Sequence, residues 1–156
     1  CSDEQLSNLV ICDLANVYQP TPRIALTAAG TNKIQSINTA AGLFQSIQKN
    51  VTVIGDTPGM IFLRTLTMLV NESYEALLLK TAKEEDLDKA MKLGANYPKG
   101  PLEWAKLIGL PYLFQALENI HSEYCDNRYR PSTLFRQETA ELMIHCYSRH
   151  PFTPEV

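Results

Sequence analysis

The chain has 156 residues, of which 45% are hydrophobic and 20% are charged, and its formal net charge at pH 7 is −3. These values are typical of an ordinary globular protein with one domain, or with a small unit joined to a second one. The weakly acidic balance gives no reason to expect nucleic acid or an anionic membrane as a partner. No apolar run reaches the length of about 18 residues that a membrane-spanning helix requires.

The start of the chain and its cysteines indicate its setting. Residues 1–3 read Cys-Ser-Asp without an initiator methionine, and we therefore expect a piece of a longer protein. Cysteines stand at positions 1, 12, 125 and 146, and no two of them form a C-x-x-C pair. This pattern favours a reduced, cytoplasmic setting over a disulfide framework.

The first 55 residues alternate short apolar runs with one helical pattern. Runs rich in β-branched residues predict strands near residues 8–13 and 23–28, and a third at 51–54. Before the third strand, residues 36–48 carry apolar side chains at helical spacing. A unit of strand, strand, helix and strand is too small to be a dinucleotide-binding domain.

A long apolar helix is predicted to follow. Asp56 is a capping residue and Pro58 suits a first helical turn, so the helix is expected to run from about 58 to 80. Its apolar residues cover more than one side, which predicts the central helix of a bundle. Asn71 is the polar side chain that such a helix is expected to bury.

The next stretch predicts a helix, a rigid elbow and a second helix. Acidic residues open the helix at 84–93, and Gly94 is expected to end it in the left-handed conformation. Pro101 stands at a first helical position, and Gly109 is expected to end that short helix. Further helices are predicted at residues 111–123 and 132–149, before a proline-broken tail at 150–156.

Three segments together resemble a known family. LGANYPKGPLEWAKLIGL, at residues 93–110, resembles the signature loop of the C-terminal helical domain of 3-hydroxyacyl-CoA dehydrogenases. Residues 56–61 with Arg64 resemble the opening of that domain, and residues 126–132 resemble its tail. The matching order extends over roughly residues 51–136. The closest resemblance is to the second copy in members with two helical domains, of the 3-hydroxybutyryl-CoA and phenylacetate-catabolism kind.

The resemblance implies a mainly α fold with a small α/β N-terminal unit. Residues 1–55 would form a reduced Rossmann-like unit, and residues 56–149 a helical bundle of the 3-hydroxyacyl-CoA dehydrogenase C-terminal type, which is similar to that of 6-phosphogluconate dehydrogenase. The parent enzyme would oxidise a 3-hydroxyacyl-CoA to the 3-oxo form with NAD, in the cytoplasm. The helical domain would form a homodimer contact, or would pack against the first copy in the same polypeptide.

The chemical machinery of that family is missing from this chain. No two glycines are separated by a single residue, so the G-x-G-x-x-G turn that brings the backbone close to a pyrophosphate is absent. His121, His145 and His150 do not stand in the sequence context of the family's catalytic histidine. We therefore expect no catalytic, NAD-binding or metal-binding residue in this chain, with NAD bound elsewhere in the parent enzyme.

Two family positions carry different residues here. Leu63 stands where the resemblance implies an asparagine that contacts substrate, and Lys106 stands where it implies an acid. Both departures favour a copy that is kept for packing rather than for chemistry.

A few polar and aromatic residues remain as candidates for ligand contact. Lys99, Arg128 and Arg130 are the candidate substrate-binding residues, since they could meet the phosphates of coenzyme A. The alternative is that the two arginines flank a turn and that Ser132 caps the last helix. Tyr97 and Trp104 could line an acyl pocket, but core positions are expected for both.

The sequence therefore predicts an enzyme fragment that is inactive alone. It would supply dimerisation or domain packing and part of the acyl-CoA cleft. Two alternatives use the same fold: a non-catalytic interaction module and a lone acyl-CoA-binding module.

Overall fold

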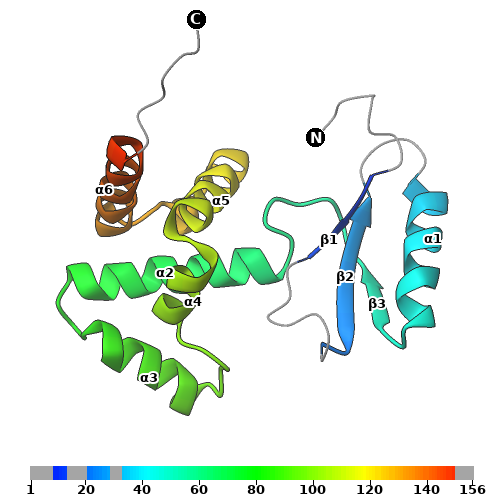
Figure 1. Cartoon of the computed structure of the whole chain (residues 1–156), viewed down its shortest axis with the longest axis horizontal. Helices are drawn as coiled ribbons and strands as arrows, with labels where there is room; N and C mark the ends of the chain where they lie inside the picture. Colours follow the sequence, from blue (N-terminus) through cyan, green and yellow to red (C-terminus); the bar gives the residue numbers. More distant parts are fainter. Residues whose placement is uncertain (1–8, 14–20, 29–32, 150–156) are drawn as a thin grey trace, which may run out of the picture. The chain divides into compact units, whose positions relative to one another are not determined.

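The computed structural model describes residues 9–13, 21–28 and 33–149 of the chain. The chain divides into two compact units, residues 1–63 and 64–156 (Figure 1). Three predictions fall partly or wholly outside the described residues. They are residue 8 of the predicted first strand, the part of the predicted loop before residue 21, and the predicted tail at 150–156.

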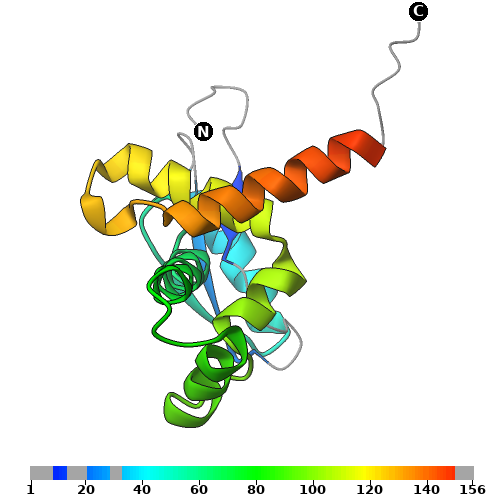
Figure 2. The same cartoon turned by 90° about the vertical axis from the view of Figure 1, so that its left-hand side faces the viewer.

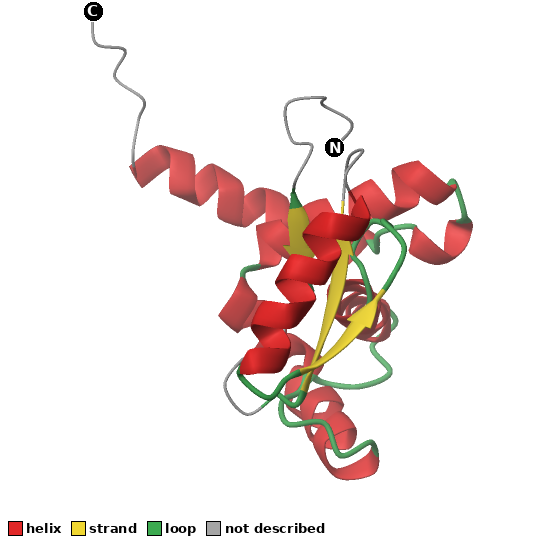
Figure 3. Ribbon diagram, turned by 90° about the vertical axis from the view of Figure 1, so that its right-hand side faces the viewer, coloured by secondary structure: helices red, strands yellow, loops and turns green. Residues whose placement is uncertain are grey.

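The first unit is a three-stranded sheet with one helix. Its strands are β1 (Val10–Cys12), β2 (Arg23–Ala28) and β3 (Asn50–Val53), and its helix is α1 (Lys33–Ser46). The strand order is β1-β2-β3, with β1 antiparallel and β3 parallel to the middle strand. The predicted order of strand, strand, helix and strand is confirmed, and α1 lies against one face of the sheet (Figure 3).

The middle strand carries the core of this unit. Ile24, Leu26 and Ala28 of β2 are buried, at alternate positions along the strand. Alternate residues point to the same face of a sheet, so these three side chains share one face. Cys12 pairs with Leu26 across the β1–β2 ladder, and Leu26 pairs with Val53 across the β2–β3 ladder.

The long helix α2 (Phe62–Leu78) begins later than the sequence predicts. Residues 58–61 form a turn instead, in which Gly59 has φ +74° and Met60 has φ +46°. Asp56 therefore does not cap the helix. The cap comes from Asp13, whose carboxylate accepts hydrogen bonds from the N–H groups at the helix start.

The second unit is a bundle around α2. Its other elements are α3 (Glu84–Gly94), α4 (Pro101–Ile108), α5 (Leu110–Tyr124), the 3-10 helix η2 (Asn127–Tyr129) and α6 (Thr133–Arg149). Its core is apolar and aromatic, and its most deeply buried large side chains are Val70, Leu113, Leu117, Ile120 and Phe135. The helix predicted at about 58–80 is α2, which is shorter and buries Leu66, Val70 and Tyr74. Figure 2 shows α6 extending beyond the other helices of this unit.

The elbow between α3 and α4 agrees with the prediction except at one residue. Pro101 opens α4, and Gly109 ends it with φ +106°, as predicted. Gly94, however, is still helical, so the prediction of a left-handed stop there was wrong. The left-handed residue is Asn96, with φ +55°. Asparagine tolerates this region better than most residues, because its short polar side chain bonds locally.

Candidate functional site

The family-like elbow is held together by carboxylates. Asp88 of α3 is 8% exposed, and its Oδ1 and Oδ2 atoms accept from the N–H groups of Leu102 at 2.8 Å and Glu103 at 3.1 Å. A carboxylate at a helix N-terminus satisfies free N–H groups and complements the helix dipole. Asp88 thus caps α4 from a neighbouring helix, a role that fixes the crossing of α3 and α4.

Glu103 closes the same elbow from the other side. Its Oε2 accepts from the Gly100 N–H at 3.1 Å, and its Oε1 pairs with the Lys92 ammonium. The hydrogen bond from Lys92 is the main reason why the pKa of Glu103 lies below its usual value, followed by the bond from Gly100. Both acids of the elbow, Asp88 and Glu103, therefore accept hydrogen bonds that hold α3 and α4 together.

Lys106, at the position where the family resemblance implies an acid, has a local partner. Its ammonium lies 2.9 Å from Glu84 Oε2, and both side chains are more than half exposed. The hydrogen bond with Glu84 raises the pKa of Lys106 above its usual value. Such an exposed pair contributes little to stability, at most about 1 kcal/mol.

Asn71 is buried in the middle of α2, as expected, and it binds backbone. Its Nδ2 donates to the Arg130 carbonyl at 3.2 Å, and its Oδ1 accepts from the Ser132 N–H at 2.7 Å. One amide therefore fixes the backbone on both sides of Pro131. The expected cap by the Ser132 side chain is wrong, because its Oγ is buried and has no hydrogen-bond partner among the described residues.

Arg64 joins α2 to the end of α5. Its guanidinium donates to the hydroxyl of Tyr124 at 2.8 Å and to that of Tyr129 at 3.2 Å. The same group lies over the Tyr124 ring, 4.7 Å from its centre. The preceding residue, Leu63, offers no polar group where the family resemblance implies an asparagine. Arg64, the charged residue at the start of α2, is thus hydrogen-bonded to two tyrosines.

The three predicted substrate-binding residues are all exposed. Lys99 lies in the α3–α4 connection, whereas Arg128 lies in η2 and Arg130 directly follows it. Arg128 pairs with Asp126 at 2.8 Å. Arg128 is the middle residue of η2 and Arg130 directly follows η2, so only Arg130 stands beside the turn.

The two aromatic residues of the elbow have different environments. Trp104 is 5% exposed and belongs to the core, as expected. Tyr97 is 37% exposed, so the expectation of a core position was wrong for it. Tyr97 lies in irregular backbone between the left-handed Asn96 and Pro98, and not in a helix.

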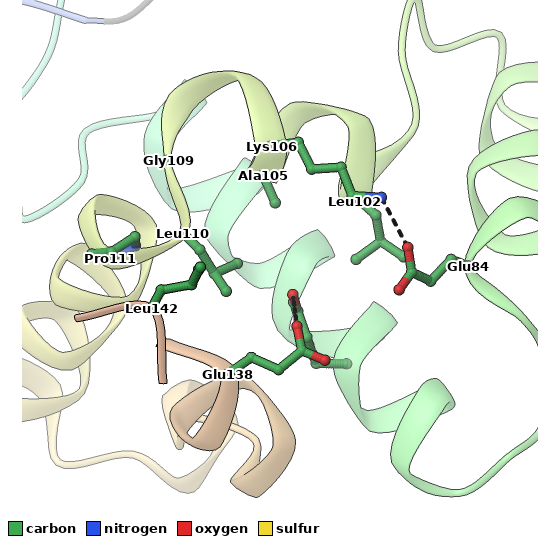
Figure 4. Close-up of a pocket in the computed structure, with 10 residues that line it drawn as sticks. Glu84, Leu102, Ala105, Lys106, Gly109, Leu110, Pro111, Glu138 and Leu142 are labelled. Atoms are coloured by element: carbon green, nitrogen blue, oxygen red, sulfur yellow. Dashed lines mark hydrogen bonds and ion pairs between the residues drawn. The ribbon is translucent and has the colours of Figure 1, made fainter. Parts of the chain in front are cut away.

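A pocket of about 490 Å³ opens within the helical unit (Figure 4). Its lining is mainly apolar and comes from five helices and the residue between α4 and α5: Tyr74, Glu84, Leu102, Ala105, Lys106, Gly109, Leu110, Pro111, Glu138 and Leu142. The Tyr74 hydroxyl donates to Glu138 Oε2 at 2.8 Å. Burial, and then the bond with Glu138, raises the pKa of Tyr74 well above its usual value.

The sequence did not reveal the polar contacts that hold the pocket and the α3–α4 elbow together. Tyr74 and Glu138 are 64 residues apart, and no local pattern pairs them. Asp88 left an indirect signal, because Gly100 and Pro101 open a helix without a capping side chain of their own. Such a start needs an acceptor from elsewhere in the fold.

A small α/β unit followed by a helical bundle with this elbow defines a class of protein, the C-terminal part of CoA-dependent dehydrogenases. Residues 59–142 match the family model of the 3-hydroxyacyl-CoA dehydrogenase C-terminal domain, and residues 1–58 match that of the 3-hydroxybutyryl-CoA dehydrogenase reduced Rossmann-fold domain. The chain belongs to the 3-hydroxyacyl-CoA dehydrogenase family.

Individual relatives agree with this assignment. The chain is 40% identical over 114 residues to the 3-hydroxyadipyl-CoA dehydrogenase of Escherichia coli, covering 73% of this chain and 24% of that protein. It is 37% identical over 95 residues to a probable 3-hydroxybutyryl-CoA dehydrogenase of Bacillus subtilis, covering 61% and 33%.

A solved structure shows the same fold. The crystal structure of a 3-hydroxybutyryl-CoA dehydrogenase from Escherichia coli matches with a TM-score of 0.75 and 35% identity, over 87% of this chain and 28% of that one. The chain thus spans about a quarter to a third of the length of these relatives. Among the described residues, none of the helices is both long and apolar enough to cross a membrane.

Proposed function

We propose that this chain is the C-terminal part of an enzyme that oxidises 3-hydroxyacyl-CoA to 3-oxoacyl-CoA with NAD. Residues 1–55 would be its reduced Rossmann-like unit, and residues 56–149 its helical domain. The family assignment and the names of the relatives support this activity for the parent protein. NAD would bind to a part of the parent enzyme outside this chain. We also propose that the parent enzyme is cytoplasmic and that its metabolic setting is phenylacetate catabolism.

Within the parent enzyme, we assign this chain to assembly. The observation that carries this assignment concerns the polar side chains in the segments that resemble the family. These side chains make hydrogen bonds to other groups of this chain. Asp88 caps α4, Asn71 fixes backbone, and Arg64 binds two tyrosines. The side chain of Leu63 is a hydrocarbon, where the family resemblance implies an amide that contacts substrate. Because these polar side chains are engaged in hydrogen bonds within the chain, we assign them to packing and not to proton transfer.

Exposed apolar residues support the assembly role. Leu142, Met143 and Ile144 on α6 are 51%, 42% and 67% exposed, and Leu142 also lines the pocket (Figure 4). We call these three residues the α6 apolar end. Successive residues of a helix point in directions about 100° apart, so these three side chains expose apolar surface on more than one side of α6. Exposed apolar surface of this kind favours burial against a partner. A second copy of the chain can cover it, since a two-fold axis lets one patch serve both subunits.

Contact with coenzyme A is a second part of the proposal. Arg128 in η2 and Arg130 directly after it are exposed cations, and phosphate groups favour arginine. Lys99 would meet a different part of the ligand, because it lies on another connection. In an acyl-CoA-binding module, these cations would bind coenzyme A without any help from the rest of the enzyme.

The test compares three measurements on the 156-residue chain. NADH formation with 3-hydroxybutyryl-CoA should stay at background, and turnover would contradict the proposal. Sedimentation should give twice the 17.5 kDa of one chain. Calorimetric titration with 3-hydroxybutyryl-CoA separates the alternatives: tight binding that Arg128→Ala with Arg130→Ala abolishes would favour the acyl-CoA-binding module.

A further inference from the structure

Asp13 connects the sheet of the first unit to the beginning of α2. The residue directly follows β1, and its N–H donates to the Ala25 carbonyl at 3.0 Å, which continues the β1–β2 pairing. The backbone of Asp13 is therefore part of the sheet. The whole residue is buried, with 7% of its surface exposed.

The carboxylate of Asp13 is used at the helix start. Its Oδ2 atom accepts from the Ile61 N–H at 2.9 Å and from the Phe62 N–H at 2.8 Å. The first N–H groups of a helix have no partner within the helix, and they carry the positive end of its dipole. A buried carboxylate on two of these groups satisfies them and complements that dipole.

Asp56, the local residue that the sequence offers as a cap, is set back from the start of α2. Gly59 and Met60 both have positive φ, and this turn separates the exposed Asp56 from the first helical residue. A left-handed conformation costs a residue such as methionine about 1–2 kcal/mol. An acceptor that fixes the next two N–H groups helps to hold the turn in place. Asp13 provides an acceptor for these groups from 48 residues away.

The same physical device binds phosphate in nucleotide-binding domains, where a strand leads to a helix N-terminus that receives the anion. In this chain the anion belongs to the strand itself. We propose that the reduced α/β unit, which has no dinucleotide fingerprint, serves as a clamp for the start of α2, and that Asp13 is its holding residue. Its role is positioning: the clamped N–H groups immediately precede Leu63 and Arg64.

Amide hydrogen exchange of the whole chain tests the clamp. Asp13→Ala should speed exchange of the Ile61 and Phe62 amides at least about tenfold, while β2 and β3 amides change much less. Asp13→Asn should lie between, because the amide oxygen can still accept but carries no charge. Asp56→Asn, which removes an exposed acid just before the turn, should leave both amides as in the unaltered chain.

Formate gives a readout that a general packing role would not produce. Asp13→Ala leaves a space of the size of a carboxylate, so formate should slow exchange at the two amides in that variant, compared with chloride at equal ionic strength. It should have no such effect on the unaltered chain or on Asp13→Asn. The proposal is overturned if the two amides exchange equally in Asp13→Ala and Asp56→Asn, or if the loss in protection spreads evenly over the sheet. If Asp13→Ala does not fold, equal exchange in Asp13→Asn and the unaltered chain overturns it.

Discussion

The side chain of Asp88 occupies the space that a side chain at Gly100 would need. A Cβ built on Gly100 would lie 2.1 Å from Asp88 Oδ1 and 2.3 Å from Asp88 Cβ. The backbone at Gly100 is ordinary, with φ −74°, so glycine is required there by packing and not by conformation. The carboxylate approaches this closely because it caps the helix that Gly100 opens.

Gly100→Ala should therefore lower the free energy of unfolding by about 1–3 kcal/mol, the range for forcing an extra methyl group into packed surroundings. Denaturation in urea measures the change. Asp88→Ala should not rescue it, because the Asp88 Cβ remains in the way. The matched control is Gly42→Ala in α1, where no atom lies within 4 Å of the new Cβ. This control should stabilise by roughly 0.5–1 kcal/mol, and equal effects at both sites would contradict the packing argument.

Gly94 and Asn96 divide the roles that the sequence assigned to one residue. A left-handed Gly94 would make Gly94→Val destabilising, but α3 runs through Gly94 and nothing lies near its Cβ position. Gly94→Ala should instead stabilise by roughly 0.5–1 kcal/mol. Asn96→Val should destabilise by about 1–2 kcal/mol, since a β-branched residue suits left-handed backbone poorly. Thermal unfolding of the two variants decides between the positions, and the opposite order would restore the left-handed stop to Gly94.

Asn71 makes a third prediction. Asn71→Leu removes the donor to the Arg130 carbonyl and the acceptor for the Ser132 N–H, and the latter bond is buried. Each buried polar group left without a partner costs about 1–3 kcal/mol. We expect a loss of about 2–5 kcal/mol in urea denaturation. Asn71→Asp keeps the acceptor for the Ser132 N–H but loses the donor to the Arg130 carbonyl. The backbone position should therefore change less at Ser132 than at Arg130. A loss below 1 kcal/mol for Asn71→Leu would show that the two contacts are not essential.

Local signals predicted the elements and the elbow well. Pro101 and Gly109 act through their own backbone restrictions, and the structure places a helix between them. The apolar circumference of α2 likewise predicted a central position. The start of α2 was predicted less well, because its cap is a tertiary contact. Asp56 and Pro58 form a good local start, but the turn at Gly59 and Met60 moves the helix start to a place where Asp13 can reach it.

In the candidate site, the burial of Asn71 and Trp104 could be predicted from residue chemistry, whereas other residues stood out only by comparison with the family. Leu63 and Lys106 were recognised as departures on that basis. Tyr74 and Glu138 meet because α2 and α6 are packed together, and each is an unremarkable helical residue in the sequence. The pocket they line depends on the angle between helices, which is set by the elbow and the core and not by any local motif.

Tyr74 leads to a prediction on pH. Its pKa is raised in the folded chain, so the folded state keeps this proton when the unfolded state has lost it. The contribution of Tyr74 to stability should be constant below a pH of about 10, the usual pKa of tyrosine, and should fall as the pH rises above it. Urea denaturation from pH 8 to 11 measures the slope, and Tyr74→Phe should make it shallower. An unchanged slope would show that other groups cause the alkaline loss. At pH 7, Tyr74→Phe should cost about 0.5–1.5 kcal/mol for the lost bond to Glu138.

The last prediction concerns the dimer and the surface that forms it. We expect sedimentation at tens of micromolar to show a species of twice 17.5 kDa, with more than about 1,000 Å² buried between the chains. Leu142→Glu in the α6 apolar end should weaken this dimer at least tenfold without lowering the melting temperature of the monomer, because the side chain is half exposed and contributes little to its own bundle. Leu107→Glu is the matched control, since that exposed leucine of α4 does not line the pocket. Met68→Glu tests the central helix, where the side chain is only half buried. Dissociation by Met68→Glu alone would place the interface on α2, and a clean 17.5 kDa species for the unaltered chain would contradict self-association altogether.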